Sequence, residues 1–280
     1  MKKGISFYYG FNSDPEIRAK LIKEEGFDCV ITNADKRFNN QNGSIKKQER
    51  LFKKYGIGKS SLHFAYVTSE LPYFWQDCCI GNRMERSLKS DVKLAHKYGY
   101  TCVVVHVQGV PSEVGVNRIK RVLKLCEKLN VPLAFENIDD NAAFEYVMDN
   151  FKSEYVKFCY DSGHAHAFKP KIDYLKKYGD RLITVHLHDN MRNRDAHALN
   201  RFGSIDWDKI AKSLAKCREV NLDYELLMRV EHNMTEEEVL AECFKQAQEL
   251  EQNIKYYQTN NTTKQTKSAS SKPPKSSSKR

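Results

Sequence analysis

The segment CYDSGHAHAF, residues 159–168, places Asp161, His164 and His166 close together in the chain. It follows Val156-Lys157-Phe158, a stretch suited to a buried strand. Carboxylate and imidazole groups are preferred protein ligands of divalent metal ions. The spacing therefore predicts a metal centre at the end of this strand, with Asp161 and His164 serving the metal and His166 beside it or structural.

The same residue types follow other short apolar runs along the chain. These residues are His63, His106, Glu136, His186, His188, Asp189 and Glu231, and a nearby loop adds Asp195 and His197. A single histidine at a strand end is more often a hydrogen-bonded structural residue. Many converging carboxylates and imidazoles, however, would be costly to desolvate unless a cation neutralised them. In HLHD, His186 and His188 share one face of the strand, so only one of them needs to be a ligand.

The elements that would position these residues alternate regularly. Short apolar segments rich in β-branched and aromatic residues are separated by segments of helical period, and several helices close on glycine. The expected strands are 4–10, 27–32, 60–66, 102–109, 132–138, 156–164, 182–189 and 225–231, and the expected helices are 14–26, 46–56, 83–99, 116–130, 142–151, 172–179, 206–217 and 235–252.

This alternation predicts an α/β fold with parallel strands, either a (β/α)8 TIM barrel or a doubly wound open sheet. The barrel is favoured because polar residues end nearly every strand, and a barrel gathers those ends into one ring. We expect one domain over residues 1–258. Residues 259–280 are rich in Ser, Thr and Lys and contain no large apolar residue, which predicts a disordered tail.

Charge and composition limit the classes of function. The net charge is +10, but seven basic residues and no acid follow Glu251, so the body is only mildly basic. No run of about 18 apolar residues predicts a membrane span. The N-terminal sequence MKKGISFYYG lacks the features of a signal peptide. We expect a cytoplasmic protein whose 8 scattered cysteines are reduced thiols.

The chain resembles the xylose isomerase-like TIM barrels, a superfamily that includes sugar-phosphate isomerases and epimerases and the endonuclease IV family. The segments that carry the resemblance are LHFAY, VVVHVQG, AFENI, CYDSGHAHAF, VHLHDN, RDAH, FGSIDW and MRVE. One departure lies in RFGSIDW, where only Gly203 remains of a usual Gly-x-Gly turn. We expect FGSIDW to be a loop followed by a helix that Asp206 initiates.

The resemblance implies site residues one by one. In the single-metal epimerase branch the ligands would be Glu136, Asp161, His186 and Glu231, with Glu136 and Glu231 also acting as catalytic base and acid. His164 would contact substrate there. The extra ligands by which the endonuclease branch holds three zinc ions would be His63, His106, His164, Asp195 and His197.

The first functional reading is a sugar or sugar-phosphate isomerase or epimerase that uses Mn, Mg, Co or Zn and acts through an enediolate. His164 or His188 would orient substrate hydroxyls. Arg192, Arg194 and Arg201 would bind a phosphate group.

Two other readings stay open. One is a three-zinc phosphodiesterase that cuts DNA at abasic sites, and only this alternative makes nucleic acid a partner. The segment VTSELPYFWQD, residues 67–77, carries aromatic side chains that suit either stacking on DNA or covering a sugar site. The other is a non-catalytic barrel that binds a metabolite. A homo-oligomer is compatible with each reading.

Overall fold

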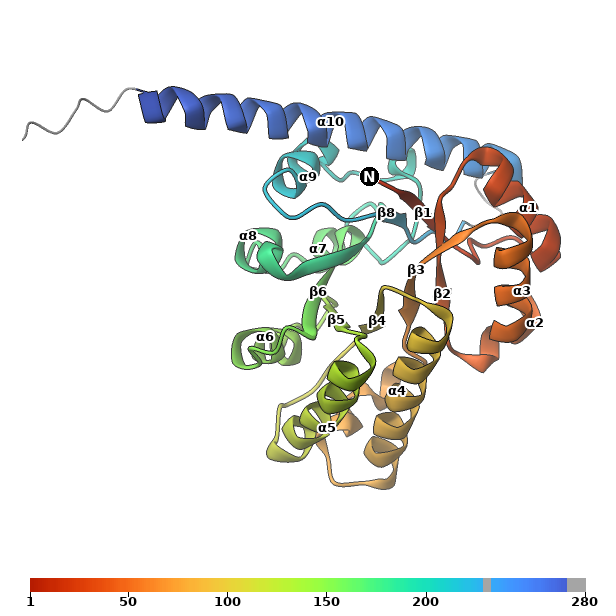
Figure 1. Cartoon of the computed structure of the whole chain (residues 1–280), viewed down its shortest axis with the longest axis vertical. Coiled ribbons are helices and arrows are strands. Elements are labelled where there is room, and N and C mark those ends of the chain that lie inside the picture. The colour runs from red at the N-terminus through yellow and green to blue at the C-terminus, as the bar shows by residue number, and fades with distance from the viewer. Residues whose placement is uncertain (229–232, 271–280) are drawn as a thin grey trace, which may run out of the picture.

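The computed structural model describes residues 1–228 and 233–270, and for 261–270 it describes the backbone alone. Parallel strands form one eight-stranded sheet in the order β7-β6-β5-β4-β3-β2-β1-β8. The strands are β1 (Lys3–Ser6), β2 (Cys29–Asn33), β3 (Gly58–His63), β4 (Cys102–Val105), β5 (Leu133–Glu136), β6 (Val156–Asp161), β7 (Leu182–His186) and β8 (Leu222–Tyr224). A parallel bridge between Leu187 and Tyr224 joins the two ends of the sheet. The predicted TIM barrel is therefore confirmed (Figure 1).

The eighth strand differs from its predicted position at 225–231. β8 is earlier in the chain, because Leu222, Asp223 and Tyr224 pair with Lys3, Gly4 and Ile5 of β1. Leu222 and Tyr224 are fully buried, so the short run LDY fills a strand position that the longer apolar run ELLMRV was expected to fill. Consequently Glu225 is the first residue after the strand.

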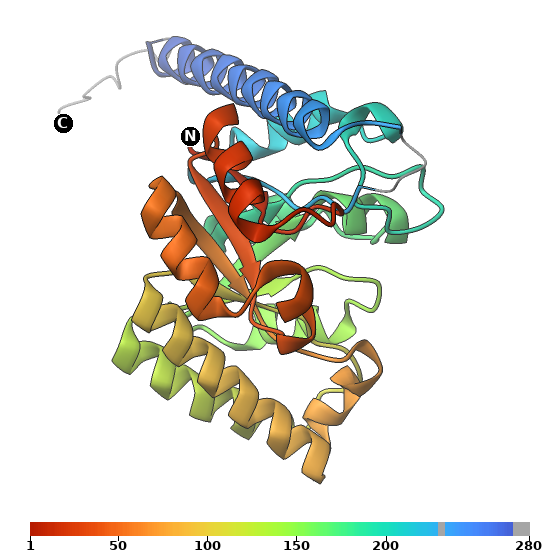
Figure 2. The same cartoon turned by 90° about the vertical axis from the view of Figure 1, so that its right-hand side faces the viewer.

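Helices surround the sheet (Figures 1 and 2). They are α1 (Pro15–Glu25), α2 (Asn39–Asn42), α3 (Ile45–Tyr55), α4 (Cys79–Tyr98), α5 (Glu113–Leu129), α6 (Ala142–Asn150), α7 (Ser162–Phe168), α8 (Tyr174–Tyr178), α9 (Trp207–Leu214) and α10 (Glu236–Ser270), with short 3-10 turns η1 (Lys36–Phe38), η2 (Thr68–Trp75), η3 (Gly179–Arg181) and η4 (Asn200–Phe202). Side-chain caps explain several starts: Asp14 caps α1, Ser44 caps α3 and Asp206 caps α9. The expected loop and Asp-initiated helix at FGSIDW are thus confirmed.

Helix α10 is much longer than its predicted range of 235–252. It packs along α9 and α1, and its last part projects beyond the barrel (Figure 1). The helix takes in residues 259–270, the first part of the segment predicted to be a disordered tail. Residues 271–280 lie outside the described residues.

The cysteines and the apolar character of the helices bear on two of the expectations from composition. All eight cysteines are free thiols, and Cys29, Cys102, Cys126, Cys159 and Cys243 are buried. None of the helices in residues 1–228 and 233–270 combines the length and apolar character needed to cross a bilayer.

A buried arginine fixes the loop that follows β3. The Arg118 guanidinium on α5 donates to the carbonyls of Phe74 and Gln76, each at 2.7 Å, and to Asn82 Oδ1 at 2.8 Å. The side chain is 1% exposed, so its hydrogen bonds compete little with water. It therefore ties η2 to the α4–α5 pair, which lies side by side in both ribbon views.

Replacing Arg118 by methionine is expected to destabilise the fold by about 2–4 kcal/mol, because buried carbonyls lose their donors. Urea unfolding would measure this loss. The control Lys120→Met alters an exposed side chain on the same helix and should change stability by less than about 0.5 kcal/mol. Equal stability of the two variants would contradict the role assigned to Arg118.

Asp91 on α4 is a buried carboxyl that accepts from the Ala65 N–H at 3.3 Å. Burial raises the pKa of Asp91 from 3.8 to about 7. A raised folded-state pKa means that the folded protein holds the proton more tightly. The resulting stabilisation is full below pH 3.8 and is lost as the pH rises through 7.

Asp91→Asn should therefore gain stability relative to the parent between pH 5 and pH 8, by at most about 4 kcal/mol. Urea unfolding of both proteins at several pH values, with metal content held fixed, would measure the difference. A difference that does not change with pH would contradict the burial argument.

Candidate metal centre

Glu136, the last residue of β5, lies at the middle of a ring of histidines. Its Oε2 is 3.1 Å from His106 Nε2, 3.1 Å from His186 Nδ1 and 3.7 Å from His63 Nε2. Its Oε1 is 3.1 Å from His164 Nδ1. Glu136 and His186 are fully buried. Histidines at or just after the ends of β3, β4, β6 and β7 thus converge on the carboxylate at the end of β5.

The centre of this ring has the composition of a single-metal site. Donor atoms of Glu136, Asp161, His186 and Glu225 all lie within 4.8 Å of one another. The His186 Nδ1 atom is 3.1 Å from a carboxylate oxygen of both Glu136 and Glu225. Two glutamates and an aspartate around one imidazole form a donor set suited to a divalent cation.

Glu225 is the residue that sequence reasoning missed. The predicted fourth ligand, Glu231, lies outside the described residues, so its role stays a prediction. In the structure the glutamate beside His186 is Glu225, because β8 ends at Tyr224. The signal available in the sequence was the short buried run LDY directly before this glutamate.

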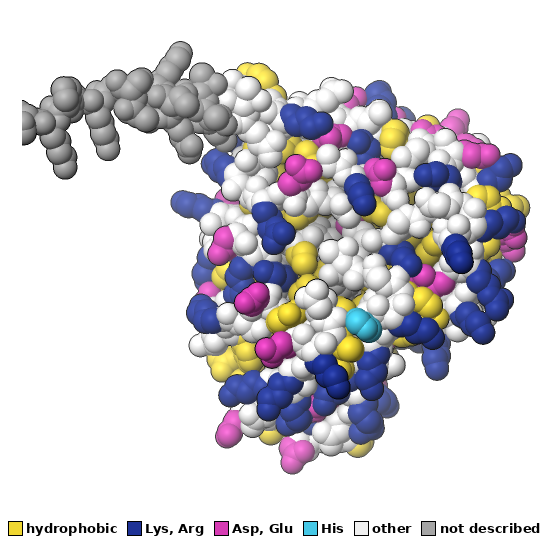
Figure 3. All heavy atoms as spheres, in the orientation of Figure 1, with side chains coloured by type: hydrophobic (Ala, Val, Ile, Leu, Met, Phe, Trp, Pro, Cys, Tyr) yellow, Lys and Arg dark blue, Asp and Glu magenta, His cyan; other side chains and the backbone are white. Residues whose placement is uncertain are grey.

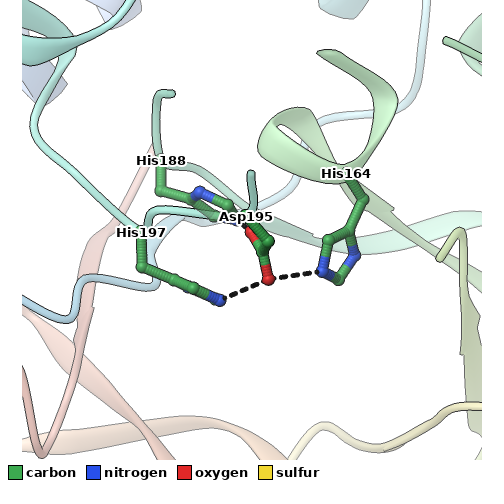
Figure 4. Close-up of side chains that lie close together, drawn as sticks. All are labelled: His164, His188, Asp195 and His197. Atoms are coloured by element: carbon green, nitrogen blue, oxygen red, sulfur yellow. Dashed lines mark hydrogen bonds and ion pairs between the residues drawn. The ribbon is translucent and has the colours of Figure 1, made fainter. Parts of the chain in front are cut away.

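A second cluster comprises His164, His188, Asp195 and His197 (Figure 4). Asp195 Oδ2 lies 3.2 Å from His164 Nε2 and 3.0 Å from His197 Nε2. His188 stacks on His197 with ring centroids 4.0 Å apart, and its Nε2 is 3.0 Å from Asp161 Oδ2. His188 thereby connects this cluster to the first one.

A third cluster comprises His63, His106 and Glu136. The two imidazoles meet edge to face with ring centroids 4.8 Å apart. All the predicted ligands other than Glu231 are therefore brought together in the described structure, in three clusters: the first and third share Glu136, and the second contacts Asp161 of the first through His188.

Backbone carbonyls orient three of the histidines. The Nδ1 atoms of His63, His164 and His197 lie 3.2, 2.8 and 2.9 Å from the carbonyl oxygens of Phe64, Asn137 and Glu225. A ring that donates Nδ1–H to a carbonyl presents a neutral Nε2 as a metal ligand. This arrangement leaves Nε2 directed at the carboxylates.

The donor atoms also fit a metal because many of them lack another partner. Both oxygens of Glu136, both ring nitrogens of His186, Nε2 of His106 and Oδ1 of Asp195 are buried without a hydrogen bond among the described residues. Buried polar atoms of this kind are costly unless something satisfies them. A divalent cation between them would satisfy several at once.

The electrostatics of the metal-free protein show how tightly these groups are coupled. Burial would raise the pKa of Glu136, but the charges of His106 and His186 outweigh it and hold this pKa well below its usual value. Burial would lower the pKa of His197, yet its hydrogen bond to Asp195 raises it to about 9. Metal binding at these ligands would compete with protons and release them.

The loop that carries Asp195 and His197 is fixed by Asp189. Asp189 pairs with Ala198 through two backbone hydrogen bonds. Its carboxylate accepts from the N–H groups of Ser204 and Ile205 and from Trp207 Nε1 at 2.7 Å. A Cβ at residue 203 would overlap this carboxylate, which explains why Gly203 is the one glycine kept in RFGSIDW.

The cavity at this centre has a volume of about 280 Å³ and is lined by residues that include Tyr66, Leu71, Gln108, Phe168 and Glu225. The arginines predicted to bind phosphate do not line it. Arg192 lines a different cavity, Arg201 lies over the Phe202 ring, and Arg194 is exposed. A role for Arg194 and Arg201 in substrate binding stays a prediction.

Comparison with known proteins agrees with this geometry. The family description "Xylose isomerase-like TIM barrel" matches residues 19–251. The chain belongs to this family. The resemblance inferred from the sequence motifs is therefore confirmed for family and fold.

Solved structures with the same fold superpose on nearly the whole chain. A D-tagatose 3-epimerase-like protein gives a TM-score of 0.72 with 16% identity, covering 93% of this chain and 99% of its own. D-psicose 3-epimerase from Clostridium cellulolyticum H10 gives 0.67 with 17% identity, covering 92% and 99%. The IolI protein with a bound zinc atom gives 0.69 with 18% identity, covering 92% and 99%. At these identities the likeness establishes the fold.

A curated sequence relative is uncharacterised protein y4fM of Sinorhizobium fredii. It is 48% identical over 61 residues, which is 21% of this chain and 20% of that protein. The match spans about one fifth of the relative's length.

Proposed function

We propose that the protein is a divalent-metal-dependent isomerase or epimerase of sugars or sugar phosphates. The observation that carries this proposal is the position of Glu136 and Glu225, each 3.1 Å from the same His186 nitrogen, with Asp161 completing the donor set. Two carboxylates around one centre can remove a proton from carbon and return one from another direction. Similar folds in proteins described as sugar 3-epimerases support the substrate class.

The chain's own residues supply binding and proton transfer. The cavity of about 280 Å³ suits a small polar molecule such as a monosaccharide. Tyr66 and His106 form one wall, with ring centroids 4.7 Å apart, and Phe168 lies against His164. Glu136 and Glu225 act as the base and acid on the substrate carbon, so the role that the sequence suggested for Glu231 is proposed for Glu225.

A bound Mn, Mg, Co or Zn ion, held by Glu136, Asp161, His186 and Glu225, would supply Lewis acidity that stabilises the enediolate form of the substrate. His164, which lines the cavity, would hydrogen-bond substrate hydroxyls, whereas His188 is fully buried and would act by holding Asp161. Their positions are fixed by Asn137 and by Asp161. Gly163 permits this arrangement because a Cβ there would overlap the His188 ring.

A second candidate is a three-zinc phosphodiesterase acting on abasic DNA. The observation that favours it is the presence of three ligand clusters, including His63 with His106 and His164 with Asp195 and His197. Several adjacent cations suit phosphoester hydrolysis because they activate water and neutralise the phosphate.

Two features favour the sugar reaction over DNA cleavage. Seven of the basic residues behind the net charge of +10 follow Glu251, so the body of the protein has only a small excess of positive charge for a footprint on DNA; on the one face drawn in Figure 3, Lys and Arg are interspersed with Asp and Glu. Duplex binding depends on such a footprint. In addition, the solved structures that superpose on this chain include proteins described as sugar 3-epimerases.

Solvent exchange in heavy water would test the proposal. Protein loaded in turn with Mn, Co or Zn would be incubated in D2O with ketohexoses, aldoses and their phosphates, and carbon-bound deuterium would be read by mass spectrometry. Incorporation that requires protein and metal would support an enediolate reaction. No incorporation with any sugar, together with metal-dependent nicking of an abasic duplex, would contradict it and support the second candidate.

A further inference from the structure

A separate cavity of about 520 Å³ lies on the outer side of α7, away from the metal centre. It is enclosed by α7, α8, α9 and the ends of the segment 190–204. None of the proposed metal ligands lines it. His166, which the metal centre does not use, does line it, so α7 carries His164 on one side and His166 on the other.

The lining of this outer cavity is strongly basic. Four cationic side chains belong to it: Lys169, Lys171, Arg192 and Lys209. None of them forms an ion pair with another residue in the described part of the chain, and each is exposed. Their charges are therefore available to a ligand.

The two aspartates that line the same cavity are already engaged. Asp173 caps α8 by accepting from the Lys176 N–H at 3.0 Å, and Asp206 caps α9 by accepting from the Lys209 N–H at 3.0 Å. Four cations against these two carboxylates leave the charged lining with an excess of two positive charges.

Two of the cationic residues have an unusual backbone conformation. Lys169 has φ +48° and Arg192 has φ +62°, the left-handed conformation that non-glycine residues seldom adopt. Arg192 is also held by its N–H donating to Asn190 Oδ1 at 2.9 Å. These two residues enter the cavity from opposite segments, one after α7 and one after β7.

Neutral donors and an apolar wall complete the outer cavity. The Ser204 hydroxyl lies 2.8 Å from His166 Nε2, and the cavity is also lined by Ser213. Ile172 and Ile205 provide apolar surface for the rest of a ligand.

We propose that this outer cavity is a binding site for a small organic phosphate, distinct from the metal centre. Several unpaired cations around a pocket with hydroxyl donors recognise a phosphate group. The volume of about 520 Å³ leaves space for a sugar or nucleoside attached to that group. Because Arg192 and Ser204 lie near the two ends of the segment that carries Asp195 and His197, the ligand would contact the same loop as the second ligand cluster.

Isothermal titration calorimetry of the full chain would test this site, with inorganic phosphate, ribose 5-phosphate and AMP as separate probes and sulfate as a comparison. The variant is Lys169→Ala/Lys209→Ala, and the matched control is Lys216→Ala, which removes an exposed lysine outside the cavity. Each lost charge-assisted contact is worth about 1.5 kcal/mol, so the double variant should bind at least about tenfold more weakly than the parent and the control.

The variant Glu136→Gln tests whether a phosphate binds at the outer cavity or at the metal centre, because it alters the metal centre alone. We expect the Kd of the organic phosphates to stay unchanged in this variant and to rise with salt in all proteins. Thermal unfolding would verify that each variant is folded. Absence of binding by the parent up to about 10 mM, equal binding of sulfate, or binding lost in Glu136→Gln but kept in the double lysine variant would each overturn the proposal.

Discussion

Glu136→Gln is expected to remove metal binding from the centre and to reduce turnover by at least about 10³-fold. The substitution keeps the volume of the side chain but removes the charge that four imidazoles face. Two of the three ligand clusters would lose their shared carboxylate. Metal content by elemental analysis and deuterium incorporation into the substrate would be measured on the same preparation.

The matched control for this variant is Glu154→Gln, the same change at an exposed glutamate just before β6, at the end of that strand opposite Asp161. It should keep parental metal content and turnover. A Glu136→Gln protein that retains parental metal content and turnover would contradict the role of this carboxylate as a metal ligand and catalytic group. Thermal unfolding of the two metal-free variants would show whether a loss reflects the site or the fold.

Glu225→Gln is the second variant expected to have a large effect, with a loss of turnover of about 10³-fold or more. Glu225 lies beside His186 and its carbonyl oxygen accepts from His197, so it connects two clusters. Substitution keeps the backbone carbonyl and therefore leaves His197 in place. The expected result is loss of the first metal with retention of the fold.

Glu231→Gln is the informative comparison, since the resemblance of MRVE to the family pattern assigned the fourth ligand to Glu231. We expect this variant to keep metal and activity. The opposite outcome, activity lost in Glu231→Gln and kept in Glu225→Gln, would show that Glu231 provides the ligand. The two variants therefore decide which of the two glutamates after β8 is the fourth metal ligand.

Much of the architecture follows from the sequence because strand ends and helix caps are local signals. The run VKFCYD is apolar until Asp161, and β6 ends at that residue. Asp206 was expected to initiate a helix and it caps α9. Eight such units with parallel strands leave few ways to close a sheet, and a barrel brings all the polar ends to one mouth.

The features that sequence reasoning missed depend on pairing between distant segments. The position of β8 is set by its register with Lys3–Ile5 of β1, and within the sequence the short run LDY is a weaker strand signal than the longer apolar run ELLMRV. Helix α7 was expected to be the end of a strand, but the Asp161 carboxylate accepts from the His164 N–H at 2.6 Å and starts a helix there. The loop with Asp195 and His197 reaches the mouth only because Asp189 pairs with Ala198.

Metal content of untagged protein purified without chelator tests the central claim most directly. We expect at least one divalent ion per chain, which chelation removes and added metal restores. Metal at 100–1,000 times its Kd should raise the free energy of unfolding by about 3–4 kcal/mol. Three zinc ions per chain would favour the phosphodiesterase as the next activity to assay. Protein that contains no metal and gains no thermal stability from Mn, Co, Mg or Zn would contradict the proposed metal centre.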